Sequence, residues 1–152
     1  MSAISGMTLL GVGEILAITG IVLQVLQSVD QVSKLFDRLH NAPRHIRNFR
    51  KSASRLEFNF KCLQEEVECN GSIHIPTADY EDIHQTLEAC KTLLYKYKNT
   101  LESQGAVGGV RRAYWSFTSG QELDGRREQI DRVYVHIIQP IWLRLIRYGI
   151  FK

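Results

Sequence analysis

Four stretches of the chain repeat apolar residues at alternating intervals of three and four, and this period restricts the fold more than any other feature. Such spacing places apolar residues on one face of an α-helix, whereas a half-buried β-strand would place them at every second position. The stripes are Ile15, Ile18, Val22, Val25, Val29, Val32, Phe36, Leu39; Ile46, Phe49, Ala53, Leu56, Phe60, Leu63, Val67; Ile83, Leu87, Cys90, Leu94, Tyr97, Leu101; and, more loosely, Ile130, Tyr134, Ile137, Ile141, Leu145, Tyr148. The sequence therefore predicts an all-α fold, a four-helix bundle with seams near coiled-coil geometry.

The ends of the first three helices are expected where their stripes stop. Asn41-Ala42-Pro43 separates the first helix from the second, and a proline suits the first turn of a helix. Asn70-Gly71 has the composition of a C-terminal cap, which makes residues 72–76 a loop. Thr77 is a candidate cap for the third helix, and Gly105 is expected to end it.

The fourth helix is expected to begin after residue 119. Ser119 and Glu122 have the spacing of a capping box. Residues 110–118 form a possible short extra helix before it, bounded by glycines. Pro140 is expected to kink or end the fourth helix, because it lacks an amide hydrogen and clashes with the preceding turn.

Composition narrows the class of protein. A chain of 152 residues with 44% hydrophobic residues and three prolines has the size of one domain, residues 1–152, and enough apolar residues for a core. The net charge of +3 is too small to indicate nucleic-acid binding. Three cysteines without a CxxC pair suggest neither disulfides nor zinc, and we expect reduced thiols in the cytoplasm. The N-terminus, which has no Lys or Arg before Lys34, does not resemble a signal peptide.

Charge is unevenly distributed between the second and third helices. Residues 43–61 carry six basic residues and one acid, whereas residues 62–104 carry eight acids and three lysines. One interpretation is that the two helices pair in the bundle and expose solvated faces. The other is that the basic helix contacts anionic lipid head groups. The residues assigned to that contact are Arg44, Arg47, Arg50, Lys51 and Arg55.

No motif in the chain indicates catalysis. The sequence lacks GxSxG, HExxH and a phosphate-binding glycine loop followed by Lys and Ser or Thr. His40 and His45 flank the turn at Pro43 without an evident third ligand, so we interpret them as surface residues. We therefore expect no catalytic residue, no metal and no cofactor, and an enzyme is the weakest of the functional hypotheses.

The N-terminal segment, residues 6–29, is unusual because Glu14 is its only charge. The fifteen residues from Ile15 to Val29 are fewer than the roughly 20 that span a bilayer, but extension back to Met7 makes the run long enough. Leucines also lie off the main stripe. Two hypotheses stay open: a central helix buried in the bundle, or a metastable helix that is released into a membrane. In the second, Glu14 would face a pore or a partner helix.

Several stretches resemble the fungal HeLo-like (HELL) domains, which stand at the N-terminus of fungal NOD-like receptors and related cell-death proteins. The resemblance covers residues 6–138 and rests on the glycine-dotted apolar start, "VSKLFDRLHNAPRHIRNFRKSASRLEFNFKCLQ" and "YWSFTSGQELDGRREQIDRVYVHI". It implies a helical bundle similar to the executioner domain of the mixed-lineage kinase-like pseudokinase. It also implies a membrane-targeting toxin whose N-terminal helix is exposed after oligomerisation. The residues assigned to this membrane-inserting segment are Gly11, Gly13, Glu14, Leu16, Gly20 and Leu23.

The C-terminal part departs from that family pattern. Members usually continue into a nucleotide-binding module or an amyloid-forming tail, whereas this sequence stops at Lys152, as an excised domain or a stand-alone protein would. Its last segment, "IWLRLIRYGIFK", interleaves aromatic and basic residues. Such a segment fits a membrane interface, and it fits equally a core-facing helix with a basic rim.

The sequence thus favours a cell-death execution domain, cytoplasmic at rest and at the plasma membrane when activated. Its expected partners are membrane lipids, including anionic ones, further copies of itself, and a NOD-like receptor or amyloid-signalling protein, with no nucleic acid. The alternative is a non-toxic adaptor or regulatory domain in fungal innate-immunity-like signalling. It would self-associate through exposed apolar residues such as Leu16, Leu23 or Trp142.

Overall fold

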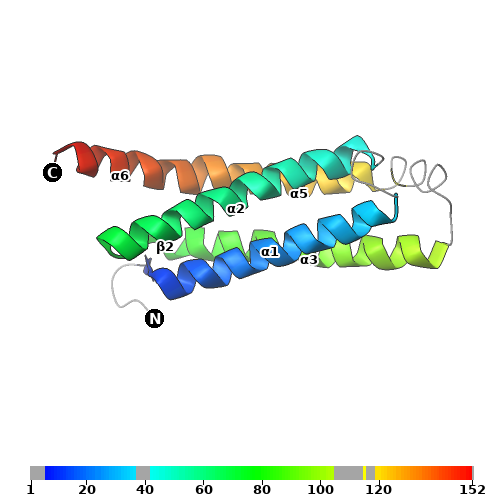
Figure 1. The fold of residues 1–152 in the computed structure, drawn as a ribbon, viewed down its shortest axis with the longest axis horizontal. Helices are drawn as coiled ribbons and strands as arrows, with labels where there is room; N and C mark the ends of the chain where they lie inside the picture. Colours follow the sequence, from blue (N-terminus) through cyan, green and yellow to red (C-terminus); the bar gives the residue numbers. More distant parts are fainter. Residues whose placement is uncertain (1–5, 37–41, 105–114, 116–118, 152) are drawn as a thin grey trace.

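Each apolar stripe forms the inner side of a long helix in the computed structural model, which describes residues 6–36, 42–104, 115 and 119–151. The helices are α1 (Val12–Lys34), α2 (Arg44–Asn70), α3 (Thr77–Gln104) and a continuous run of α5 (Gly120–Val133), η2 (Tyr134–Ile138) and α6 (Gln139–Phe151). The prediction of an all-α helical bundle is confirmed (Figure 1).

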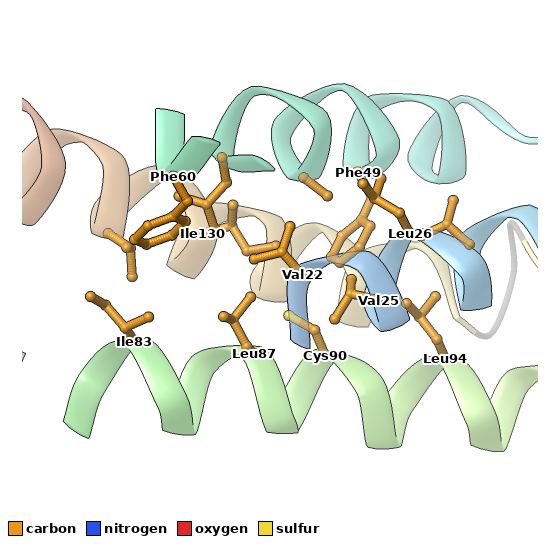
Figure 2. Close-up of a cluster of buried hydrophobic side chains, with 14 of the residues drawn as sticks. Val22, Val25, Leu26, Phe49, Phe60, Ile83, Leu87, Cys90, Leu94 and Ile130 are labelled. Carbon is orange, nitrogen blue, oxygen red and sulfur yellow. The ribbon is translucent and has the colours of Figure 1, made fainter. Parts of the chain in front are cut away.

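The stripes supply the core. Every described residue of the first three stripes is at most 5% exposed, and together with Ile130, Ile137 and Ile141 these residues join one hydrophobic cluster. Figure 2 shows side chains from α1, α2, α3 and α5 converging between the helices. Tyr134 and Leu145 are only partly buried, while Leu39 and the side chain of Tyr148 lie outside the described residues. Burial of each large side chain contributes about 1.5–3 kcal/mol to folding, so the four stripes account for the bundle.

In cross-section the helices lie at the four corners of the bundle, and α2 and α3 lie diagonally opposite each other (Figure 1). Helix α1 packs against both of them, and so does α5. The interpretation that the basic second helix pairs with the acidic third is therefore wrong, although α2 does expose a solvated basic face. The basic residues of α2 pair instead with its real neighbours: Arg50 Nε lies 2.9 Å from Asp30 Oδ1 on α1, and Arg55 Nη2 lies 2.9 Å from Asp131 Oδ1 on α5.

A small antiparallel sheet joins the N-terminal segment to residues 73–76, which the sequence predicted to be part of a loop. Strand β1 (Met7–Leu10) pairs with β2 (Ile73–Pro76), with Met7 opposite Pro76 and Leu10 opposite Ile73. The first residue of α3, Thr77, extends the pairing: its N–H donates to the Gly6 carbonyl, 2.6 Å away, and its Oγ1 lies 2.8 Å from Thr8 Oγ1. Thr77 therefore ties the sheet together rather than preceding α3 as a cap.

The predicted helix ends agree with the structure in most places. Pro43 directly precedes α2, and its carbonyl accepts from the N–H groups of the first turn. Gly71 has a φ of +96°, a region that favours glycine, and its N–H donates to Val67 O at 2.9 Å. Ser119 is the N-cap of α5 but its side chain makes no capping bond, so the capping box is not formed. Of the possible extra helix over residues 110–118, only Trp115 is described, and it is fully buried.

The fourth helix does not end at Pro140. This residue is the second of α6 and follows directly on the π-helical turn η2. A proline ring clashes with the carbonyl four residues earlier, here His136, and cannot complete the usual hydrogen bond. The wider π turn over Tyr134–Ile138 moves that carbonyl out of the ordinary α-helical position, and the helix continues through it.

Candidate membrane-active site

Helix α1 is long and apolar enough to cross a membrane, and it is the one helix in the described ranges that passes this test. The core helix of a water-soluble bundle passes the same test. The position of α1 in the chain and the exposure of its faces therefore also bear on whether it could insert. The helix begins at Val12, so Met7–Leu10 does not lengthen it as the sequence suggested. The predicted segment of residues 6–29 is thus a short strand followed by a helix.

The outer face of α1 is largely uncovered. Only 39% of the residues in its most apolar stretch are buried inside the bundle. Leu16 is 49% exposed and Leu23 is 41% exposed, and both lie away from the core stripe. No charged residue occurs between Glu14 and Asp30. The helix therefore presents an uncharged face with two exposed leucines to solvent.

Two glycines on α1 are not required by the packing of the monomer. A Cβ added to Gly13 or Gly20 would meet nothing within 4 Å, and neither residue has a positive φ. Gly20, in the interior of the helix, nevertheless costs about 1 kcal/mol of helix stability relative to alanine. Gly11, by contrast, precedes the helix, and a Cβ there would lie 2.9 Å from Glu14 Oε1.

Glu14 acts as a cap in the folded protein. Its Oε1 accepts a hydrogen bond from the Gly11 N–H at 2.8 Å, and it lies in the first turn of α1. A carboxylate there satisfies an otherwise unpaired backbone donor and interacts favourably with the positive end of the helix. The charge of Glu14 thus marks the start of α1 rather than its middle.

Within the part of the chain that the structure describes, few polar links hold α1 in place. We call the β1–β2 pairing and its two Thr77 contacts the clasp, since they join the N-terminal segment to the connection between α2 and α3. Along the helix, Asp30 pairs with Arg50 of α2, and Gln24 Oε1 accepts from Lys91 Nζ of α3 at 3.0 Å. Both links involve substantially exposed side chains, and such contacts contribute little to stability. Apolar packing is therefore the main attachment of α1.

The seam between α2 and α5–η2–α6 is different, because a chain of polar contacts runs along it. His45 Nδ1 lies 2.7 Å from Asp124 Oδ2, and Arg127 approaches both Asp124 and Asp131 at 3.8 and 3.5 Å. Arg55 bonds Asp131 and stacks 4.1 Å above the centre of the Tyr134 ring. Trp142 Nε1 donates to Asn59 Oδ1 at 3.1 Å. We call these contacts the polar ladder; they join α2 to the last helix at several points, although the Arg55–Asp131 pair is about as exposed as the Arg50–Asp30 pair of α1.

The five basic residues predicted to meet lipid separate into two groups. Arg50 and Arg55 are engaged in the ion pairs with Asp30 and Asp131, and the hydrogen bond that Arg50 donates to Asp30 raises the pKa of Arg50. Arg44, Arg47 and Lys51 are exposed on the opposite side of α2 from its buried stripe, with no ion pair to any described residue. Of the five, only these three are available to an external anion.

The described cysteine and histidine side chains do not gather at one site. Cys69 is exposed, Cys62 is half-buried and Cys90 is buried, and all three are free thiols. Burial raises the pKa of Cys90 to about 12, although the charge of Arg126 acts in the opposite direction. His45 belongs to the polar ladder, and His40 lies outside the described residues. Within the described ranges, no group of three or more His, Cys, Asp or Glu side chains could hold a metal ion.

Sequence reasoning missed the clasp and the polar ladder. The alternation of Ile73, His74 and Ile75 was the available signal for β2, and it extends over too few residues to indicate a strand by itself. When the chain is compared with family models, with curated proteins and with solved structures, none of them matches.

Proposed function

We propose that this chain is a membrane-targeting cell-death execution domain of the HeLo-like kind, in which α1 leaves the bundle and inserts into a bilayer. It acts by binding and conformational change rather than as an enzyme. It rests in the cytoplasm and moves to the plasma membrane on activation, with oligomerisation accompanying insertion. The observation that carries the proposal is the uncovered, charge-free face of a helix long enough to span a membrane.

The way α1 is held supports its release. Its attachment is mostly apolar, and a bilayer offers equivalent surroundings to the buried stripe once the helix has left. The polar ladder of α2 and α5–η2–α6 has no counterpart on α1 within the described residues, so these two helices would remain joined after α1 departs. The polar contacts that must break when α1 is released are then those of the clasp and the two exposed polar links.

The charges of α1 suit this role. Glu14 lies in the first turn and Asp30 in the last part of the helix, so the uncharged stretch between them covers fifteen residues, or about 22 Å of helix. With the hydrocarbon core about 30 Å thick, one of the two acids has to face a pore or a partner helix instead of lipid. Gly13 and Gly20 would allow such helices to approach closely.

The experiment that tests the proposal is dye release from anionic liposomes by the full chain and by Leu16→Lys. Leu16 is half exposed, so the lysine leaves the bundle folded but places a charge on the inserting face. We expect leakage by the wild type and a loss of at least tenfold in the variant; Gly20→Arg serves as a second such variant.

The matched control is Tyr95→Lys, which places the same charge at a 63% exposed position on α3. It should leak as the wild type does. Equal leakage by Leu16→Lys and the wild type, with both folded by circular dichroism, would contradict insertion of α1.

One observation favours a second candidate, a non-toxic adaptor. Leu16 and Leu23 are exposed in the folded state, so the same face of α1 is available to a second copy without any release. Trp142, the third residue considered for this role, is half-buried and bonded to Asn59. Light scattering that shows an oligomer, together with no leakage from liposomes, would favour the adaptor. In that case Leu16→Lys should yield a smaller particle.

A further inference from the structure

Helix α6 carries a second exposed surface that combines apolar and basic side chains. Leu143 is 67% exposed and Ile146 is 57% exposed, which makes them two of the most exposed large hydrophobic residues described. Arg144 and Arg147 lie beside them on the same helix and are exposed as well. Neither arginine makes an ion pair with a described residue. We call these four residues the α6 surface.

The opposite side of α6 holds the helix in a defined orientation. Ile141 is 2% exposed, Trp142 and Leu145 pack against the core, and Trp142 Nε1 donates to Asn59 of α2. The α6 surface is therefore turned away from the bundle by packing and a hydrogen bond, and nothing in the described part of the chain covers it. Figure 1 shows α6 reaching past the ends of α1 and α2 at this end of the molecule.

The charge of this region points to an anionic partner. From Arg132 to Lys152 the sequence has four basic residues and no acid, whereas Asp131, the last acid, belongs to the polar ladder. A helix with apolar and cationic residues exposed together binds at the head-group level of anionic bilayers, where each cation contributes about 1 kcal/mol.

We propose that the α6 surface docks the folded protein on an anionic bilayer, lying in the head-group region with Leu143 and Ile146 toward the acyl chains. The clasp lies at the same end of the bundle as the free end of α6 (Figure 1), so docking brings the start of α1 close to the membrane. This inference takes its target, a bilayer, from the proposed function, but it requires no release of α1. The two can therefore fail separately.

The test is co-sedimentation of the full chain with vesicles of phosphatidylcholine and phosphatidylserine, beside vesicles of phosphatidylcholine alone. Dye release is recorded in parallel. We expect binding only to the anionic vesicles. Arg144→Gln with Arg147→Gln should weaken binding roughly 30-fold, from about fivefold for each cation, and added salt should reproduce this loss. Leu143→Ser with Ile146→Ser should weaken binding by roughly tenfold at any salt concentration.

The triple variant Arg44→Gln, Arg47→Gln and Lys51→Gln tests the competing expectation that the start of α2 contacts lipid, because it removes three exposed basic residues far from α6. It should bind within a fewfold of the wild type. Binding that depends on this triple variant and not on α6 would overturn the inference, as would wild-type protein that ignores anionic vesicles. A lipid-free oligomer that Arg144→Gln with Arg147→Gln dissolves would also overturn it, because the α6 surface would then bind a second copy.

Leakage separates this inference from the proposed function. Leu16→Lys should abolish leakage and retain binding, whereas the α6 variants should lose both at low lipid concentration and recover leakage when lipid is in excess. If the α6 variants bind normally while Leu16→Lys stops leakage, docking by α6 is wrong and insertion of α1 stands.

Discussion

Cys90 illustrates how its surroundings, and not its residue type, decide the chemistry of a side chain. It lies on the buried stripe of α3 among Leu87 and Leu94 (Figure 2), and it is fully buried. Because an apolar environment disfavours the thiolate, the pKa of Cys90 rises to about 12. Cys69, which has the same thiol, is exposed at the end of α2. Cys90 therefore behaves as a small apolar residue, as the sequence suggested, and Cys69 does not.

The raised pKa of Cys90 predicts a loss of stability in alkali. Below about pH 9 the thiol is protonated in both the folded and the unfolded state, so it contributes no pH dependence. Between about pH 9 and 12 the unfolded chain releases this proton and the folded chain retains it. The free energy of unfolding should then fall by about 1.4 kcal/mol per pH unit from this group. Urea titrations at several pH values in this range give the free energy of unfolding at each pH. This free energy should fall less steeply with pH for Cys90→Ala than for the wild type, and an equal fall in both proteins would contradict the prediction.

At the scale of the elements, the helices could be predicted from sequence and their neighbours could not. The stripe from Ile46 to Val67 is local and repeats over six turns, so its buried face was evident. The strand Ile73–Pro76 depends on a partner 66 residues earlier in the chain, and no local pattern announces it. Likewise, the position of α2 diagonal to α3 results from packing, so complementary composition suggested a pairing that does not exist. Of the two outcomes expected for Pro140, an end to the helix does not occur, because a π turn can accommodate a proline inside a helix.

The sequence gives the position of each glycine but does not show whether its backbone conformation or its neighbours require a glycine there. A Cβ at Gly20 meets nothing, whereas Gly71 has a φ of +96° that side chains rarely adopt. We predict that Gly20→Ala raises the free energy of unfolding by about 1 kcal/mol, through helix propensity and a less flexible unfolded chain. Gly71→Ala should lower it by about 1 kcal/mol or more, because the left-handed conformation becomes strained.

Thermal unfolding followed by circular dichroism checks both glycine variants, with the midpoint expected to rise for Gly20→Ala and to fall for Gly71→Ala. A fall for Gly20→Ala would mean that the outer face of α1 is already covered in solution, for example by a second copy. The exposed face that carries the proposed function would then not be free.

On the scale of the whole molecule, the bundle is unequally joined. Helix α2 and the run from α5 to α6 are connected by the polar ladder, which begins at His45 and ends at Trp142. Among the described residues, helix α1 is attached through its apolar stripe, two exposed polar links and the clasp. Polar contacts lose their value when α1 enters a bilayer and apolar burial does not, so the stripe of α1 would be buried in either state, while release would expose the faces of α2 and α3 against which it packs. The clasp is then the natural place to control release.

A disulfide across the clasp should decide whether release is needed. Leu9 and His74 are opposite each other in the sheet, and both are exposed, so Leu9→Cys with His74→Cys places two thiols at the spacing of paired strands without disturbing the core. Replacing Cys62 and Cys69 by serine prevents wrong pairing, while Cys90 is buried. The oxidised protein should bind anionic vesicles but leak at least tenfold more slowly than the wild type, because the bond ties β1 to the connection between α2 and α3. Reduction should restore leakage, and Leu9→Cys alone should leak normally with or without reductant. Rapid leakage by the fully oxidised protein would show that α1 acts without opening the clasp, which would leave its exposed face, and not its release, as the active feature.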